Sequence, residues 1–417
     1  MEAIEQLTRA LTLIALLPGT PALRRDQIKL QVALINPLIH IKGFAAPETK
    51  AVAERGPLLI EQAEALGERP EDPLLLFSAL YGIWIESYAA FDGDMVCNLA
   101  AQLLGLAEKQ GATVPLMIGH RLMGISLLCT GDIARGRAHF DRAIALHDPV
   151  EHRPLATRFG VDIGVSISSY RSMALWVLGY SGAALADAEH ALRDAREINH
   201  IATLMYALHN TSLAHIWCGN CGAANAQLDE VVSLADKKGA LYWKANGILV
   251  RGWVFALTGK AANAIQMLTS GIIAYRSTGS TSWMPLHLSY LAKANAELGQ
   301  LNDAWRCINE AMTTMETTKE RWCEAEINRA AGEIALTSPE RDEAKAKAYF
   351  ERALAVAREQ QAKSWELRAA ISMARLWRDQ GKRQQAHDLL APIYGWFTEG
   401  FDTLDLKDAK ALLDELR

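Results

Sequence analysis

The sequence predicts an all-α fold, a right-handed solenoid of about ten helix-turn-helix repeats of about 40 residues each. Three features of the 417 residues carry this prediction. Glycines recur at a regular spacing, small residues stand at fixed distances from each glycine, and large apolar residues occupy a further fixed position. Half of the residues are hydrophobic and 22% are charged, a balance that excludes a disordered or collagen-like chain.

A glycine marks the turn of each regular repeat, between two apolar helical stretches. These glycines are Gly131, Gly179, Gly219, Gly259, Gly299 and Gly381. The gaps between them are 48, 40, 40, 40 and 82 residues, and the last gap equals two units of about 41 residues. A period of this length is the signature of a helical repeat array rather than of several globular domains.

The residues around each turn fit a helical hairpin. A small residue stands five positions after each glycine and another seven positions before it, as Gly136 and Gly124 do around Gly131. Nine positions after the glycine the residue is mostly large and apolar, as Phe140 is. Small residues let the paired helices approach closely, and the large residue fills the space between them. The glycine turn with its small residues favours tetratricopeptide-like repeats with lengthened helices.

We predict that residues 1–417 form a single superhelical domain. Residues 1–20 form a half repeat, 21–111 irregular amino-terminal repeats, 112–400 regular repeats and 401–417 a carboxy-terminal capping helix. In the first segment Ile4, Leu7 and Leu11 belong to an apolar stripe at helical spacing. One side of that stripe has no predicted partner, so we expect this helix to fray or to promote self-association.

Composition and charge exclude several classes of protein. A formal net charge of −5 argues against nucleic acid as a partner. The longest nearly apolar stretch, residues 73–85, is too short to cross a bilayer, so we expect no membrane partner. Six scattered cysteines do not form a disulfide framework, and residues 2–17 do not resemble a secretory signal. We therefore expect a cytoplasmic protein.

Four segments carry a resemblance to a known family. They are SWELRAAISMARLWRDQGKRQQAHDLLAPIYGWFTEGFDTLDLKDAKALLDEL, HDPVEHRPLATRFGVDIGVSISSYRSMALWVLGY, RGWVFALTGK and KERWCEAEINRAAGEIAL. They resemble the carboxy-terminal tetratricopeptide-repeat region of large bacterial signalling proteins. In those proteins a class III adenylate/guanylate cyclase domain, or a winged-helix domain, precedes a predicted AAA-type ATPase. The resemblance implies a signalling scaffold that senses a ligand or docks a partner.

The catalytic domains of those proteins have no counterpart in this sequence. Gly259-Lys260 lacks the earlier glycine of a phosphate-binding G-x-x-x-x-G-K-[ST] loop and is followed by alanine. We therefore expect a protein that is not an enzyme and that uses no cofactor and no metal. Its predicted function is to bind a protein, a peptide or a small molecule in a concave groove.

Two motifs keep an enzymatic alternative open. Cys218 and Cys221 stand in a W-C-G-x-C sequence like that of thioredoxins, although Gly219 also fits the repeat register as a plain turn. His147 and His152, with neighbouring carboxylates, stand in a loop that could bind a metal, although prolines and polar residues are also typical of a surface connection. The alternative function is thus a redox or metal-dependent enzyme.

Binding candidates come from the helix positions that face the groove. Positions thirteen, ten and six residues before the turn glycines are predicted to point inward, and they include Arg121, Tyr206, His209, Trp253, Lys293, Arg368 and Arg375. The longer gap before Gly179 indicates an insertion over residues 147–162. We expect this loop either to narrow the groove or only to bridge two repeats, and its candidates are His152, Arg153, Arg171 and Trp176.

Tryptophans form a further periodic feature. Trp243, Trp283 and Trp365 stand sixteen residues before their turn glycines. We interpret them as packing between repeats rather than as a cage for a ligand.

Overall fold

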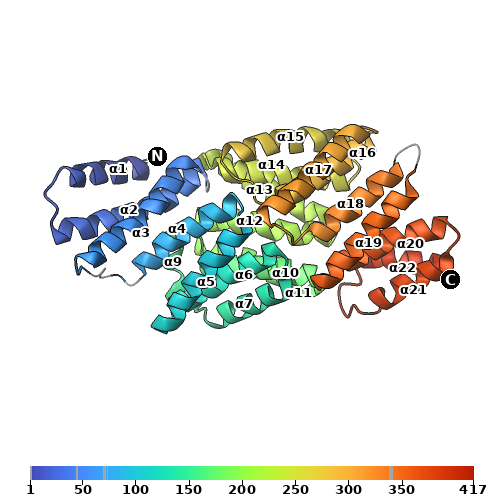
Figure 1. Ribbon diagram of the computed structural model, residues 1–417, viewed down its shortest axis with the longest axis horizontal. Helices are drawn as coiled ribbons and strands as arrows, with labels where there is room; N and C mark the ends of the chain where they lie inside the picture. Colours follow the sequence, from blue (N-terminus) through green and yellow to red (C-terminus); the bar gives the residue numbers. More distant parts are fainter. Residues whose placement is uncertain (1, 44–45, 69–71, 73, 338–340) are drawn as a thin grey trace.

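The computed structural model describes residues 2–43, 46–68, 72, 74–337 and 341–417. Within these residues the chain forms 22 helices and no strand, which confirms the predicted all-α solenoid (Figure 1). Nine helix pairs follow one another along the chain, with α1 before them and α22 after them. Two short helices, α8 and α9, lie between the third and fourth pairs.

The pairs have the following bounds. They are α2 (Pro21–Lys42) with α3 (Pro47–Ala65), α4 (Leu75–Ala89) with α5 (Gly93–Gln110), α6 (Thr113–Thr130) with α7 (Ile133–Ala145), α10 (Ile163–Val177) with α11 (Ser181–Ile198), α12 (Ile201–Trp217) with α13 (Cys221–Lys238), α14 (Leu241–Leu257) with α15 (Ala261–Ser277), α16 (Met284–Glu297) with α17 (Leu301–Thr318), α18 (Glu324–Thr337) with α19 (Glu343–Glu359), and α20 (Lys363–Asp379) with α21 (Arg383–Tyr394). The remaining helices are α1 (Glu2–Ala15), α8 (Pro149–His152), α9 (Leu155–Phe159) and α22 (Leu404–Leu416).

All six predicted turn glycines connect the two helices of a pair and have a left-handed backbone, with φ between 70° and 99°. Glycine adopts this conformation without strain, which explains why it recurs at the turn. The second pair differs: Gly93 begins α5, and the left-handed residue of that turn is Phe91, with φ 38°. The turn of this irregular repeat therefore lies at Phe91, two residues before Gly93.

Small and large residues interlock within hairpins as the spacing predicts. A Cβ atom at Gly252 would lie 2.7 Å from Leu268, and one at Gly124 would lie 2.6 Å from the Phe140 ring. In the α10/α11 hairpin two small residues meet instead, and the Ser172 hydroxyl donates to the Ala184 carbonyl at 2.7 Å. The large residue of one helix thus occupies the space that the small residue of its partner leaves free.

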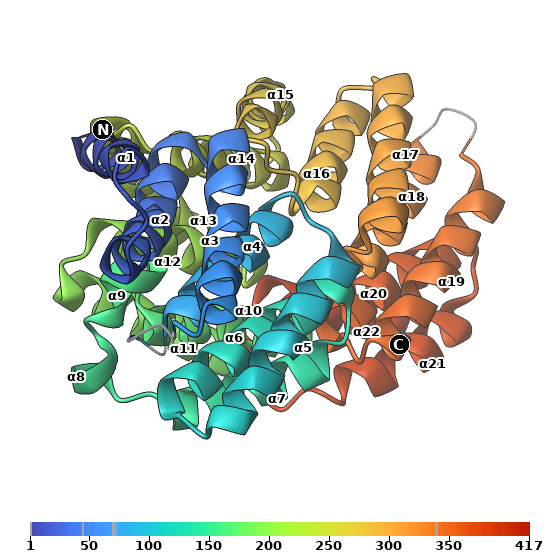
Figure 2. The same ribbon diagram turned by 60° about the vertical axis from the view of Figure 1, so that its left-hand side comes forward.

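The superhelix winds tightly enough for its successive turns to touch (Figures 1 and 2). The backbone N–H groups of Thr281 and Ser282 donate to the Ala89 carbonyl, and those of Arg321 and Trp322 donate to the Cys129 carbonyl. Each contact joins residues that lie 192 or 193 positions apart in the sequence. We call this line of contacts the inter-turn seam.

Tryptophan side chains fill the interior along this seam. The Trp176 ring lies 4.8 Å from Trp217 and 4.7 Å from Trp365, and Trp217 lies 5.8 Å from Trp322, measured between ring centroids. Each of these four side chains is at most 2% exposed. At this level the interior is a packed core, where the sequence predicts an open groove. Of the three periodic tryptophans, Trp365 packs between turns of the superhelix, whereas Trp243 and Trp283 line the cavity described below, where the sequence predicts packing alone.

The insertion over residues 147–162 forms hydrogen bonds with the amino-terminal repeats. The Tyr81 hydroxyl of α4 donates to the Phe159 carbonyl at 3.1 Å, and Arg158 Nε donates to Ser78 Oγ at 2.7 Å. The amide of Asn36 on α2 donates to the Thr157 carbonyl at 3.3 Å. The loop thus lies against α2 and α4.

Two features of single helices bear on the sequence predictions. Helix α1 packs along α2, and among its described residues none is buried. Helix α6 is long and apolar enough to cross a membrane by length and composition, but two thirds of it (67%) is buried inside the fold, as in a core helix.

Candidate functional site

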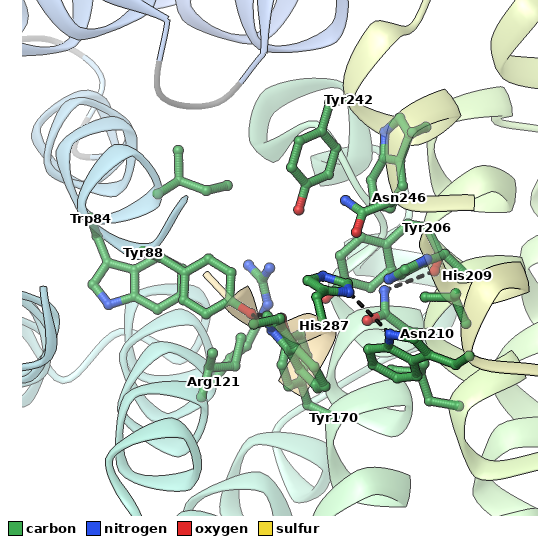
Figure 3. Close-up of a pocket in the computed structure, with 17 residues that line it drawn as sticks. Trp84, Tyr88, Arg121, Tyr170, Tyr206, His209, Asn210, Tyr242, Asn246 and His287 are labelled. Atoms are coloured by element: carbon green, nitrogen blue, oxygen red, sulfur yellow. Dashed lines mark hydrogen bonds between the residues drawn. The ribbon is translucent and has the colours of Figure 1, made fainter. Parts of the chain in front are cut away.

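A cavity lies inside the superhelix beside the tryptophan core, between helices of its two turns (Figure 3). Its lining is mostly aromatic, from α4, α6, α10, α12, α14 and the start of α16: Trp84, Ile85, Tyr88, Arg121, Ile125, Tyr170, Tyr206, His209, Asn210, Leu213, Tyr242, Trp243, Asn246, Val250, Trp253, Trp283 and His287. We call it the central cavity.

Hydrogen bonds hold the aromatic wall in place. The Tyr88 and Tyr170 hydroxyls are 2.6 Å apart, and Trp283 Nε1 donates to the Tyr88 hydroxyl at 2.9 Å. Tyr88 thereby joins α4 in one turn of the superhelix to the start of α16 in the next. Burial raises the pKa of both tyrosines well above its usual range, so the hydroxyls stay neutral.

Arg121 brings a positive charge to the cavity. Its side chain is 2% exposed, its Nε donates to Ser166 Oγ at 2.8 Å, and its guanidinium stacks on the Tyr81 ring 5.5 Å from the centroid. Ser166 Oγ in turn lies 2.7 Å from the Tyr206 hydroxyl. Arg121 Nη1 is buried and has no hydrogen-bond partner among the described residues.

Two histidines on the wall are neutral at physiological pH. Burial lowers the pKa of His209 to about 4 and that of His287 to about 3. Trp253 Nε1 donates to His287 Nδ1 at 3.1 Å, so the single proton of that neutral ring resides on Nε2. His287 Nε2 is therefore a hydrogen-bond donor, and within the described part of the chain it has no acceptor.

A second cavity of about 1,270 Å³ lies near the carboxy-terminal repeats and has a different chemistry. Arg368 Nε donates to Asp405 Oδ2 at 2.7 Å, and Arg329 makes two bonds of 2.7 Å to Glu326. Its cationic and anionic side chains neutralise one another, so the electrostatic demand for a ligand is weak.

The structure distributes the predicted site residues over several places. Arg121, Tyr206, His209 and Trp253 line the central cavity. Lys293, Arg368 and Arg375 line the second cavity. Lys293 lies 3.8 Å from Glu297, and Arg375 donates to Asp408 at 3.1 Å.

The candidates of the insertion do not meet in one pocket. Arg153 is exposed, whereas Arg171 donates to Asp187 at 2.7 Å. His152 is buried, and its Nδ1 accepts from the Asp148 backbone N–H at 3.1 Å. Trp176 belongs to the tryptophan core. These positions indicate packing roles for His152 and Trp176 and an ion-pair role for Arg171.

The two enzymatic motifs lack the chemistry that they would need. Burial raises the pKa of the Cys218 thiol to about 12 and also raises that of Cys221, the opposite of an activated thiolate. The His147 and His152 rings lie 5.7 Å apart, and burial lowers the pKa of His147. Across the described residues, no group of three or more His, Cys, Asp or Glu side chains is placed to hold a metal.

The sequence analysis did not predict several residues that line the central cavity, above all Trp84, Tyr88 and His287. Trp84 and Tyr88 stand seven and three residues before the turn at Phe91, outside the positions that the sequence analysis counts as inward. Counting back ten and six residues from Phe91 instead gives Tyr81, which stacks on Arg121, and Ile85, which lines the cavity.

Comparisons with known proteins extend the description of the fold. No protein-family model matches the chain, and no curated protein matches it. A Rap protein complexed with competence and sporulation factor is similar over 94% of this chain and 100% of its own, with 10% identity and a TM-score of 0.61. The Rap conjugation gene regulator of the plasmid pLS20, in complex with the Phr* peptide, is similar over 93% and 95%, with 11% identity and a TM-score of 0.51.

A signal transduction ATPase with a tetratricopeptide repeat sensor, from Pyrococcus horikoshii, is similar over 89% of this chain and 54% of its own, with 13% identity. Its TM-score of 0.39 is too low to support an argument. At these identities the likenesses show the fold alone, a tetratricopeptide-like superhelix. The more specific resemblance to cyclase and winged-helix proteins stays a prediction.

Proposed function

We propose that this protein is a non-catalytic tetratricopeptide-type binding and regulatory scaffold, and that the central cavity receives its effector, a peptide or a small molecule. One observation carries the proposal. Four buried polar atoms without a hydrogen-bond partner belong to residues that line this cavity: Arg121 Nη1, His209 Nδ1, Asn246 Nδ2 and His287 Nε2. Such atoms destabilise an empty core, and a ligand that pairs them removes that cost.

The lining of the cavity supports the same proposal. Pockets for small ligands have mostly apolar walls with a few polar groups. The central cavity has such a wall, formed mainly by aromatic side chains together with a few polar ones. Two of the solved neighbours hold a regulatory factor or a peptide, which supports an effector of similar kind here.

The cavity wall suggests how binding acts on the scaffold. Tyr88 and Trp84 come from one turn of the superhelix, whereas Trp283 and His287 come from the next. A ligand that contacts both sets stabilises the closed arrangement of the turns more than an open one. The outer surface then presents a different shape to a protein partner, as the resemblance to sensor regions of signalling proteins implies.

Titration of the protein with indole, a neutral aromatic probe, tests the location of the site. We expect saturable binding with one molecule per chain, measured by isothermal titration calorimetry. The variant Val250→Trp fills the cavity and should abolish binding, since Val250 is 1% exposed and lines the wall. Leu241→Trp is the matched control, because it adds the same side chain on α14 at a position that is 57% exposed. Equal binding by both variants would refute the location.

A further inference from the structure

The central cavity carries an unbalanced positive charge. Arg121 is its one fully ionised lining residue among those described, since His209 and His287 are neutral there, and the lining contains neither aspartate nor glutamate. No described carboxylate forms an ion pair with Arg121, which instead interacts with the neutral groups of Ser166, Tyr81 and Tyr206. A charge buried among neutral groups is costly unless a counter-ion completes the site.

Other partly buried arginines show what is missing at Arg121. Arg329 pairs with Glu326, Arg368 with Asp405, and Arg171 with Asp187, each through at least one bond of 2.7 Å. The chain thus supplies a carboxylate to these guanidinium groups and leaves Arg121 without one. Because Arg121 belongs to the cavity lining, an anionic group of a ligand can take the place of that carboxylate.

The neighbouring free groups are donors as well. His287 Nε2 carries a proton, as its bond from Trp253 requires, and Asn246 Nδ2 is an amide donor without an acceptor. Figure 3 shows Arg121, Asn246 and His287 around the same space, with Tyr88 and Tyr242 on its sides. A site that offers donors and a positive charge selects acceptors and a negative charge.

We propose that the central cavity binds an organic acid with an aromatic or apolar body. Its carboxylate pairs with the guanidinium of Arg121, and its body lies against the aromatic wall. This inference rests on the proposed function and adds to it the chemical class of the effector. The carboxylate comes either from a small acid or from the carboxy-terminal end of a short peptide, and both present the same group to Arg121.

The test uses three probes of equal shape and different charge: indole-3-acetate, indole-3-acetamide and tryptamine. We expect the wild-type protein to bind the acid at least tenfold more tightly than the amide, and tryptamine least tightly. Arg121→Gln, which can keep a hydrogen bond to Ser166, should bind acid and amide equally. Arg375→Gln is the matched control, because Arg375 lies at the second cavity and should leave the preference unchanged.

The outcomes separate this inference from the proposed function. Equal binding of acid and amide by the wild-type protein, with both lost in Val250→Trp, would overturn the inference and leave the proposed function intact. Binding that survives in Val250→Trp would overturn the proposed location itself. A preference for the acid that persists in Arg121→Gln would also overturn the inference.

Two further measurements need no assumption about the indole body. The thermal midpoint of the ligand-free Arg121→Gln variant should exceed that of the wild type, because an unbalanced buried charge is removed; a lower midpoint contradicts the inference. Acetyl-alanyl-tryptophan with a free carboxylate should bind more tightly than its carboxamide, because only the carboxylate can form an ion pair with Arg121. Binding tighter than that of indole-3-acetate identifies a peptide end as the source, and weaker binding identifies a small acid.

Discussion

Replacement of Glu320 by glutamine should change how the stability of the protein depends on pH. Glu320 is fully buried next to the inter-turn seam. Both of its oxygens accept from the Trp283 backbone N–H at 2.9 Å, and one accepts from Trp322 Nε1 at 3.3 Å. Burial, opposed by these hydrogen bonds, raises the pKa of Glu320 from 4.5 to about 8. Within the described part of the chain, Glu320 forms no ion pair with a cation.

The size and sign of the effect follow from this pKa. A difference of about 3.5 pH units, at about 1.4 kcal/mol each, corresponds to about 5 kcal/mol of unfolding free energy. The folded state holds the proton more tightly than the unfolded state, so this contribution is complete below pH 4.5 and is lost as the pH rises to about 8. Glutamine has no such proton to lose. The unfolding free energy of Glu320→Gln should therefore exceed that of the wild type by an amount that grows with pH between those values, up to about 5 kcal/mol.

Urea unfolding, followed by tryptophan fluorescence from pH 4.5 to 9, measures the difference between the two proteins. Glu326→Gln is a control for which we expect the opposite change in stability. Burial alone raises the pKa of Glu326, but the positive charges of Arg329 and Arg368 outweigh it and lower this pKa below its usual range. That ion pair stabilises the fold above the unfolded pKa of Glu326, so its replacement should destabilise the protein at neutral pH. A constant free-energy difference between Glu320→Gln and wild type across the whole pH range would refute the reasoning.

Three other predictions test the seam, the thiols and the insertion. Gly179→Ala should lower the unfolding free energy by at least about 1 kcal/mol more than Gly299→Ala. Both glycines have positive φ, but a Cβ at Gly179 would lie 2.7 Å from Trp396 across the seam, whereas nothing lies within 4 Å at Gly299; equal losses in chemical denaturation would contradict the seam. The Cys218 thiol should react with iodoacetamide only slowly at pH 7, and rapid labelling detected by mass spectrometry would restore the redox alternative. His152→Ala should lower stability by about 1–3 kcal/mol, and Arg153→Ala by less than about 0.5 kcal/mol, with ligand affinity unchanged in both; lost affinity at unchanged stability would assign the loop to recognition.

Local periodicity predicts the helical hairpins because each depends on residues close in sequence. Gly252 and Leu268 belong to one hairpin, so their contact follows from a 40-residue pattern. The same register places Arg121 and Trp253 on positions predicted to face inward, and both residues line the central cavity.

The winding of the superhelix could not be predicted in the same way. The seam joins residues about 190 positions apart, such as Trp322 and Cys129, and its geometry depends on small rotations that add up over nearly five repeats. His287 and Tyr88 enter the same cavity only because of that winding. Sequence analysis therefore identifies one wall of the site and misses the wall from the adjacent turn.

The seam and the central cavity are connected through Trp283. Its backbone N–H is held by Glu320, and its indole Nε1 donates to the Tyr88 hydroxyl, which in turn contacts the Tyr170 hydroxyl on the cavity wall. A displacement of Trp283 alters the hydrogen bonds at both ends of this series, to Glu320 and to Tyr88, since each hydrogen bond tolerates only small changes in distance and angle. A ligand that orders Tyr88 therefore strengthens the contact between superhelical turns, and a loosened seam weakens the site by the same free energy. Under the proposed function, this reciprocity is the physical route from an occupied cavity to a change in the outer surface.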